Sequence, residues 1–345
     1  MKTSSNLDMA WNVFKYCTVL RALGSVMILV VLGIIGVSYY AVVVAKYGPA
    51  LFLGGLDSIT ALFVLFLFHS LLVMLVWSYF SVVITDPGGV PPNWIPNLDE
   101  ESGGAGQWAG SDNDGVDLGA NQSAMLIEPK HQGVRFCQKC NQFKPPRCHH
   151  CSVCRRCILK MDHHCVWVVN CVGAFNYKYF LLFLFYTFLE TTLVTVSLLP
   201  IFIALFTDDE IPESPGNLAA SFITFVLNLA FALSILGFLI MHISLVAGNT
   251  TTIEAFEKKT SPKWRYDLGW KINFEQIATT VAACPASNYY ITLPWDEMTM
   301  PLTSLEVFGK NKKYWLIPAY SKDDLEWLPS FQCVEYPTRP DSDDL

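Results

Sequence analysis

The hydrophobic positions of this chain are gathered into four long stretches. They run from about residue 23 to 45, 59 to 85, 180 to 206 and 219 to 245, and Glu190 is the only Asp, Glu, Lys or Arg within them. A helix crosses the hydrocarbon core of a bilayer with about 20 apolar residues. The pattern therefore predicts an all-α integral membrane protein with four transmembrane helices. Burial of these stretches in a soluble core is the alternative, and four of them in one chain disfavour it.

The composition agrees with membrane insertion and disfavours one class of partner. Hydrophobic residues make up 52% of the chain and charged residues 15%, whereas soluble domains average about 25% charged residues. The formal net charge of −7 gives no basic footprint of the kind that binds phosphate backbones. We expect the partners to include the lipid bilayer and no nucleic acid.

Lysine and arginine are concentrated on one side of the predicted spans. The segment between the second and third spans carries nine of them, and the loop at 207–218 carries none. Cytosolic loops are enriched in these residues. We therefore expect a multi-pass protein with both termini cytosolic, in an endomembrane (the Golgi or a related one) or the plasma membrane.

The segments outside the spans complete the predicted organisation. Proline and glycine at 87–89 end the second helix, and the following stretch is rich in Gly, Asn, Asp and Ser, which favours a flexible linker. The predicted parts are a cytosolic N-terminal arm at 1–22, a helix pair at 23–85, an Asp-Pro-Gly segment and acidic linker at 86–130, a cysteine-rich domain at 131–179, a second helix pair at 180–245, and a cytosolic tail at 246–345.

Eight of the 11 cysteines and four of the seven histidines lie between Cys137 and Cys171. Cys137 with Cys140 and Cys151 with Cys154 each form a C-x2-C pair, which aims two sulfurs at one ion. Structural zinc takes four tetrahedral nitrogen or sulfur ligands, so two pairs predict two zinc sites in a reducing compartment. The downstream candidates are Cys157, Cys171 and one histidine for each site. The spacing leaves open which of His149 and His150 binds, which of His163 and His164 binds, and whether Cys148 is a ligand.

Cys165 is left over by this ligand count, and it follows Asp162 and His163 directly. A histidine can take the proton of a nucleophilic thiol, and a carboxylate can orient that histidine. The third span begins at about Phe180, so the thiol should lie near the cytosolic membrane face. A fatty acyl-CoA with its chain in the bilayer could meet it there. The alternative is that Cys165 is itself a ligand and the segment is a binding module.

The cysteine-rich segment closely resembles the DHHC family of protein palmitoyltransferases, in a form like its plant members. The matching residues outside the zinc candidates include Lys144, Pro145, Pro146, Arg147, the run Asp162-His163-His164-Cys165, Trp167, Asn170, Gly173 and Asn176. The Asp-Pro-Gly segment at 86–88, the Thr-Thr-Ile-Glu segment at 251–254 and the four-span layout also fit the family.

The resemblance implies a function and a role for each matching position. Cys165 would take palmitate from palmitoyl-CoA as a thioester and pass it to cytosolic cysteines of membrane-associated proteins, with His163 as general base oriented by Asp162. Thr251, Thr252 and Trp167 would support the site, and Glu190 would border an acyl cavity between the spans. The implied zinc ligands are Cys137, Cys140, His150 and Cys157 for one ion, and Cys151, Cys154, His164 and Cys171 for the other.

Two departures from the family pattern qualify this interpretation. Val166 stands where most members have proline, which loosens the backbone beside the nucleophile. Residues 277–306 separate an Asn-Phe stretch from a Val-Phe-Gly stretch that usually follows it closely, and they resemble an insertion. The alternative functions are a catalytically impaired variant and a membrane zinc-binding scaffold without activity.

Overall fold

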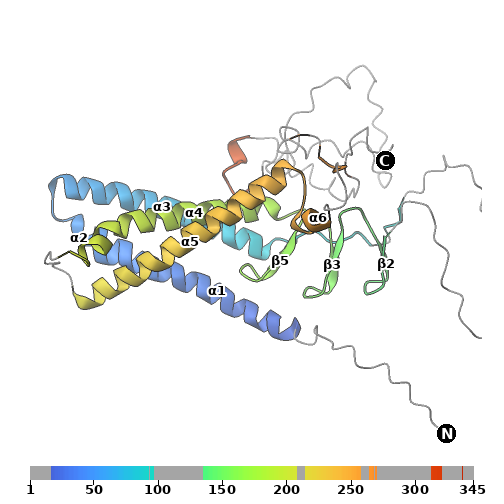
Figure 1. Cartoon of the computed structure of the whole chain (residues 1–345), viewed down its shortest axis with the longest axis horizontal. Coiled ribbons are helices and arrows are strands. Elements are labelled where there is room, and N and C mark those ends of the chain that lie inside the picture. The colour runs from blue at the N-terminus through green and yellow to red at the C-terminus, as the bar shows by residue number, and fades with distance from the viewer. Residues whose placement is uncertain are drawn as a thin grey trace, which may run out of the picture.

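The four predicted spans are long helices in the computed structural model, which describes residues 17–92, 94–96, 135–207, 214–257, 264–267, 269, 312–320 and 336 (Figure 1). All four are long and apolar enough to cross a bilayer. The helical segments are α1 (Cys17–Tyr39), which continues through the wider turns of η2 (Tyr40–Tyr47) into the short α2 (Gly48–Ala50), then α3 (Gly55–Ile84), α4 (Tyr177–Ala204) and α5 (Pro215–Ala247).

Local sequence signals explain where the helices begin and end. The Ser214 hydroxyl accepts a hydrogen bond from the backbone N–H of Asn217 and caps α5, while Pro215 occupies the first turn, where no N–H is needed. Helix α3 stops at Thr85, which is extended and precedes the Asp-Pro-Gly segment. The predicted spans are thus confirmed, with bounds that differ by a few residues.

The cysteine-rich segment folds into three antiparallel hairpins rather than into a sheet with its own core. The hairpins pair β1 (Arg135–Cys137) with β2 (Gln142–Lys144), β3 (His149–Cys151) with β4 (Arg156–Ile158), and β5 (His163–Cys165) with β6 (Asn170–Val172). Isolated two-stranded hairpins are marginal in water, so these need cross-links from elsewhere. Figure 1 shows them in a row beside one end of the helices.

The hairpins are joined to the helices by backbone contacts of the Asp-Pro-Gly segment. The carbonyl of Gly88 accepts a hydrogen bond from Leu159 N, and the carbonyl of Pro87 accepts one from Phe175 N. Only glycine fits at position 173, because a Cβ there would lie 2.7 Å from the Pro87 oxygen. These contacts fix the cysteine-rich domain against the exit of α3.

Two further short helices complete the described fold. Helix α6 (Thr252–Glu257) follows α5 directly, and η6 (Lys312–Tyr314) lies in the tail. Several predictions fall outside the described residues. These are the arm at 1–16, most of the linker at 86–130, and the proposed insertion at 277–306 with both stretches that flank it.

Candidate active site and metal centres

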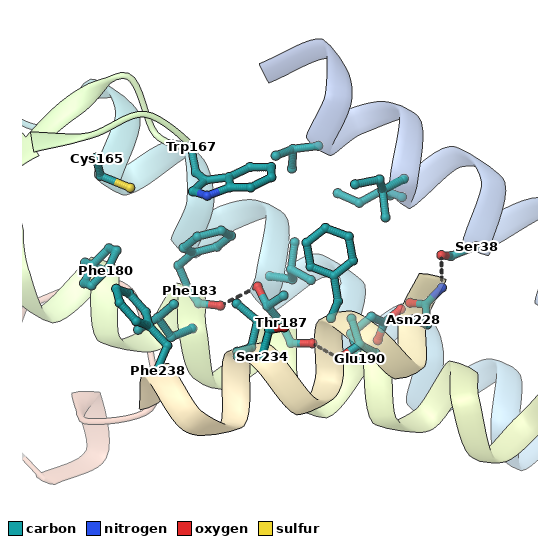
Figure 2. A pocket seen from close by; sticks show the side chains of 18 of the residues that line it. Ser38, Cys165, Trp167, Phe180, Phe183, Thr187, Glu190, Asn228, Ser234 and Phe238 are labelled. Atoms are coloured by element: carbon teal, nitrogen blue, oxygen red, sulfur yellow. Dashed lines mark hydrogen bonds between the residues drawn. The ribbon is translucent and has the colours of Figure 1, made fainter. Parts of the chain in front are cut away.

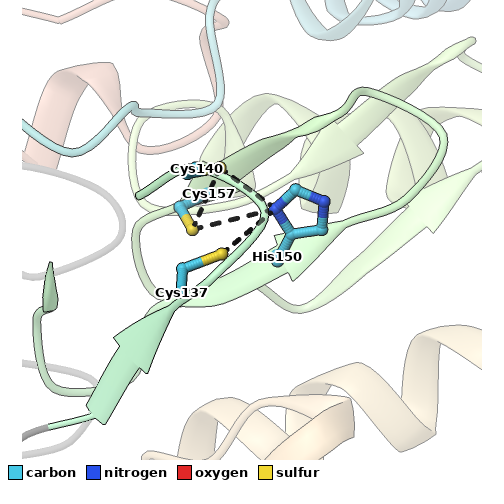
Figure 3. Close-up of side chains that lie close together, drawn as sticks. All are labelled: Cys137, Cys140, His150 and Cys157. Carbon is cyan, nitrogen blue, oxygen red and sulfur yellow. Dashed lines mark hydrogen bonds between the residues drawn. The ribbon is translucent and has the colours of Figure 1, made fainter. Parts of the chain in front are cut away.

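The eight predicted zinc ligands form two compact groups of four, each with three cysteines and one histidine. The first contains Cys137, Cys140, His150 and Cys157, shown in Figure 3. Within it, the Sγ to Nδ1 distances to His150 are 3.6, 3.2 and 3.9 Å, and Cys157 Sγ lies 3.7 Å from Cys140 Sγ. A tetrahedral zinc with sulfur at about 2.3 Å and nitrogen at about 2.0 Å requires edges of about 3.5 to 3.8 Å. The donor set therefore fits zinc.

The second group contains Cys151, Cys154, His164 and Cys171. The three sulfurs lie 3.7, 3.5 and 3.5 Å from His164 Nδ1, and Cys154 Sγ lies 3.5 Å from Cys171 Sγ. These distances fit zinc equally well. The chain thus has two Cys3His sites for structural zinc.

The strand register explains how the downstream histidine and cysteine of each site come together. His150 faces Cys157 across β3 and β4, and His164 faces Cys171 across β5 and β6. Each facing pair meets the C-x2-C turn of the preceding hairpin, so each site ties two consecutive hairpins together. This geometry chooses His150 and His164 among the candidates that spacing left open. Cys148 is buried beside the first site but is not one of its four donors.

Asp162, His163 and Cys165 lie close together in sequence, because β5 carries His163 and Cys165, and Asp162 directly precedes this strand. His163 Nδ1 donates to Asp162 Oδ2 at 2.6 Å, and the His163 ring interacts electrostatically with the Cys165 sulfur. Asp162 is 1% exposed and Cys165 is 7% exposed. The carboxylate, imidazole and thiol are therefore linked in that order.

The charges of this chain of groups favour a thiolate and an imidazolium. Burial alone would raise the pKa of Cys165, but the hydrogen bond and charge of His163 and the backbone N–H groups of Val168 and Trp167 lower it overall. Burial alone would lower the pKa of His163, but its bonds to Asp162 and Cys165 raise it to about 9. A proton thus moves from sulfur to nitrogen at low cost.

Thr252 anchors the carboxylate from the other side of the fold. Its backbone N–H donates to Asp162 Oδ1 at 2.9 Å, and its hydroxyl donates to Asp162 Oδ2 at 2.7 Å. Thr251 is buried next to it and contacts Glu254 through its backbone N–H, at 2.9 Å from the carboxylate. The Thr-Thr-Ile-Glu segment therefore lies against Asp162.

A buried ion pair that the sequence analysis gave no role holds this segment in place. Arg147 donates from Nε and Nη2 to the two carboxylate oxygens of Glu254, both at 2.7 Å. It also donates to the side chain and the backbone carbonyl of Asn249, both at 2.9 Å. Arg147 stands inside the matched motif, but nothing in the spacing shows that its partner lies 107 residues later.

The cavity beside Cys165 extends between the helices. It has a volume of about 550 Å³, within the usual range for ligand sites. Figure 2 shows Cys165 and Trp167 toward one end and Ser38 with Asn228 toward the other. The wall is mainly apolar and includes Phe68, Leu72, Phe180, Phe183, Leu184 and Phe238.

Glu190, which was expected to border an acyl cavity, is among the residues that line this one. It is 5% exposed, and neither carboxylate oxygen has a hydrogen-bond partner among the residues that the structure describes. Asn228, which the sequence analysis missed, donates to the Ser38 hydroxyl at 2.9 Å in the same wall. A polar residue in the middle of an apolar span was the available signal for it.

Comparisons with known proteins agree with this geometry. The family model described as DHHC palmitoyltransferase matches residues 130–259. The chain is 62% identical to Probable protein S-acyltransferase 14 of Arabidopsis thaliana, with 98% of each chain covered. It is 57% identical to Probable protein S-acyltransferase 13 of the same plant, over 97% of this chain and 98% of that one. It is 32% identical to Palmitoyltransferase ZDHHC20 of Homo sapiens, over 90% and 77% of the two chains.

Proposed function

Because this chain belongs to the DHHC palmitoyltransferase family, we propose that Cys165 is the nucleophile of a protein S-acyltransferase. The observation that supports this most directly is the placement of its sulfur. The sulfur lies on the wall of the apolar cavity together with His163, which is hydrogen-bonded in turn to Asp162. The Cys165 thiol is thus next to a cavity that could hold an acyl chain and next to a histidine that could take its proton.

The first half of the reaction loads the enzyme. The Cys165 thiolate attacks the thioester carbonyl of palmitoyl-CoA, and the bond between that carbonyl and the CoA sulfur breaks. CoA leaves as a thiolate, and the His163 imidazolium can protonate it. The acyl chain lies in the cavity, where its apolar surface stays out of water. Asp162 balances the charge of the imidazolium throughout this step.

The second half transfers the acyl group to a protein. A substrate cysteine gives its proton to neutral His163 and attacks the carbonyl of the acyl-enzyme. Cys165 then leaves as a thiolate and regains the hydrogen-bonded pair with protonated His163. Substrates are membrane-associated proteins with cytosolic cysteines, because the acyl-enzyme is reached from the membrane face.

The two zinc ions would act as structural cross-links. Each site provides four protein ligands, and closed sites of this kind leave no position for water. His164 and Cys171 flank the nucleophile on β5 and β6. Zinc bound there would keep Cys165 facing His163, although Val166 gives up the rigidity of proline.

We further propose an orientation for this multi-pass membrane protein. The concentration of lysine and arginine in the segment between the second and third spans supports a cytosolic position for the cysteine-rich domain and both termini. The membrane would be an endomembrane, such as that of the Golgi, or the plasma membrane. The eight thiols around the site also suit a reducing compartment.

Labelling with palmitoyl-CoA tests the assignment of Cys165. Purified wild-type protein should acquire a hydroxylamine-labile acyl group, and Cys165→Ser should acquire none while it still binds two zinc ions. The matched control is Cys148→Ser, a buried thiol outside the ligand sets, which should label as the wild type does. A non-enzymatic scaffold predicts the opposite. It would show no label in any variant, and a loss of zinc on replacing Cys165.

A further inference from the structure

A second histidine, His242, lies next to the Asp162–His163 pair. His242 belongs to the last two turns of α5 and is fully buried. One of its ring nitrogens lies within 4.8 Å of a nitrogen of His163 and of a carboxylate oxygen of Asp162. The two imidazole rings have centroids 5.9 Å apart and are tilted by 42°. His242 is not among the residues that line the cavity, so it would act on an acyl chain only through other side chains.

The surroundings of His242 are mainly aromatic. The rings of Phe238 and Phe180 meet it edge-on, with centroids at 4.6 and 5.1 Å. Its Nδ1 is hydrogen-bonded to the Tyr177 hydroxyl at 3.0 Å, while its buried Nε2 has no hydrogen-bond partner in the described part of the chain. A buried polar atom without a partner costs stability. Phenylalanine would fill the same space without that cost, so packing alone does not explain a histidine here.

The hydrogen bond with Tyr177 fixes how the His242 ring is turned. Tyr177 is the first residue of α4 and His242 lies near the end of α5, so this bond joins the two helices beside Asp162. The ring is thereby held at a defined tilt to the His163 imidazole.

We propose that His242, oriented by Tyr177, is a positioning residue that holds the His163 imidazole between Asp162 and Cys165. His163 has a side chain that is 24% exposed and borders the cavity, so it has room to turn away from the sulfur. The buried ring of His242 lies against this imidazole from outside the cavity and limits how far it can turn. The inference rests on the proposed function of Cys165.

Kinetics of Cys165 acylation by palmitoyl-CoA test this role. His242→Phe keeps the packing but removes both nitrogens, and we expect kcat to fall about 10- to 100-fold, the range seen when supporting partners are removed. KM for palmitoyl-CoA should stay within about twofold, because the cavity is untouched. His242→Asn places an amide where Nδ1 meets Tyr177 and should recover most of the lost rate. His69→Phe in α3 is the matched control and should behave as the wild type does.

Tyr177→Phe provides an independent arm, since it removes a single oxygen. It should lower kcat to a similar extent, and His242→Phe with Tyr177→Phe should be no slower than His242→Phe alone, because the two act as one unit. A wild-type kcat in His242→Phe would overturn the proposal. So would a loss that appears only in KM. If His242→Phe does not bind two zinc ions and is therefore misfolded, the kcat of Tyr177→Phe decides between the outcomes, and a wild-type value overturns the proposal. If wild-type Cys165 is not labelled at all, the proposed function itself fails.

Discussion

Replacing Arg147 by methionine removes one half of a buried ion pair that ties the cysteine-rich domain to the segment after α5. The side chains of Arg147 and Glu254 are 1% and 4% exposed. The variant loses two charge-assisted hydrogen bonds to Glu254 and two to Asn249. Breaking a buried pair by removing one partner costs about 3–5 kcal/mol, because the other charge stays buried. We expect the cysteine-rich domain to lose about that much free energy of unfolding.

The chain offers a matched control for this substitution. Arg156 pairs with Asp86 at 2.8 Å, but their side chains are 42% and 59% exposed. Exposed pairs contribute about 0–1 kcal/mol, so Arg156→Met should cost no more than that. Arg147→Met combined with Glu254→Leu should recover at least half of the loss, because no charge is then left buried.

The assay is urea unfolding of the detergent-solubilised protein. Unfolding is monitored through the zinc that is released to a chromophoric chelator. Zinc release reports the cysteine-rich domain itself, which is where the ion pair acts. Equal costs for Arg147→Met and Arg156→Met would refute the reasoning. So would a combined variant that is less stable than Arg147→Met alone. Arg147→Met should also slow acylation, since the Thr252 bonds to Asp162 depend on the same segment.

Three further predictions concern charge, metal and the cavity. Activity should fall as pH rises past the His163 pKa of about 9, because the imidazolium is lost. In Asp162→Asn this alkaline limit should move to lower pH, and an unchanged pH profile would contradict the pairing. Removing zinc with a chelator should both unfold the hairpins, which would then be cleaved by protease at 135–172, and abolish acyl labelling. Labelling of zinc-free protein would count against structural zinc. Glu190→Leu should lower KM for palmitoyl-CoA about tenfold, because a carboxylate leaves the apolar cavity wall, whereas Glu190→Gln, which keeps a polar group there, should lower KM less. A wild-type KM in both variants would contradict a role for this side chain in acyl binding.

The four spans and the zinc domain could be predicted because their signals are local. A run of about 20 apolar residues fixes a span, and two C-x2-C pairs fix two sites. The choice of His150 and His164 needed the strand register, since adjacent histidines are equivalent in spacing. Only the resemblance supplied it beforehand, and the geometry agrees.

The missed features all depend on contacts between distant segments. Arg147 and Glu254 are 107 residues apart, and Asn228 meets Ser38 across 190 residues. Periodicity describes each segment alone and says nothing about which faces meet. The surroundings of His242 depend in the same way on contacts between α5 and distant residues, such as Tyr177 and Asp162. Whether residues 277–306 impair activity stays a prediction, which deletion of that segment would test by its effect on labelling.

The most direct test of the account is the fate of the acyl group on Cys165. Purified wild-type protein is incubated with palmitoyl-CoA, the acylated peptide is identified by mass spectrometry, and a cysteine-containing membrane-anchored peptide is then added. The account predicts a palmitoyl thioester on Cys165 that disappears as the acyl group appears on the added cysteine. An acyl group found on another residue, or one on Cys165 that no added thiol removes, would contradict it.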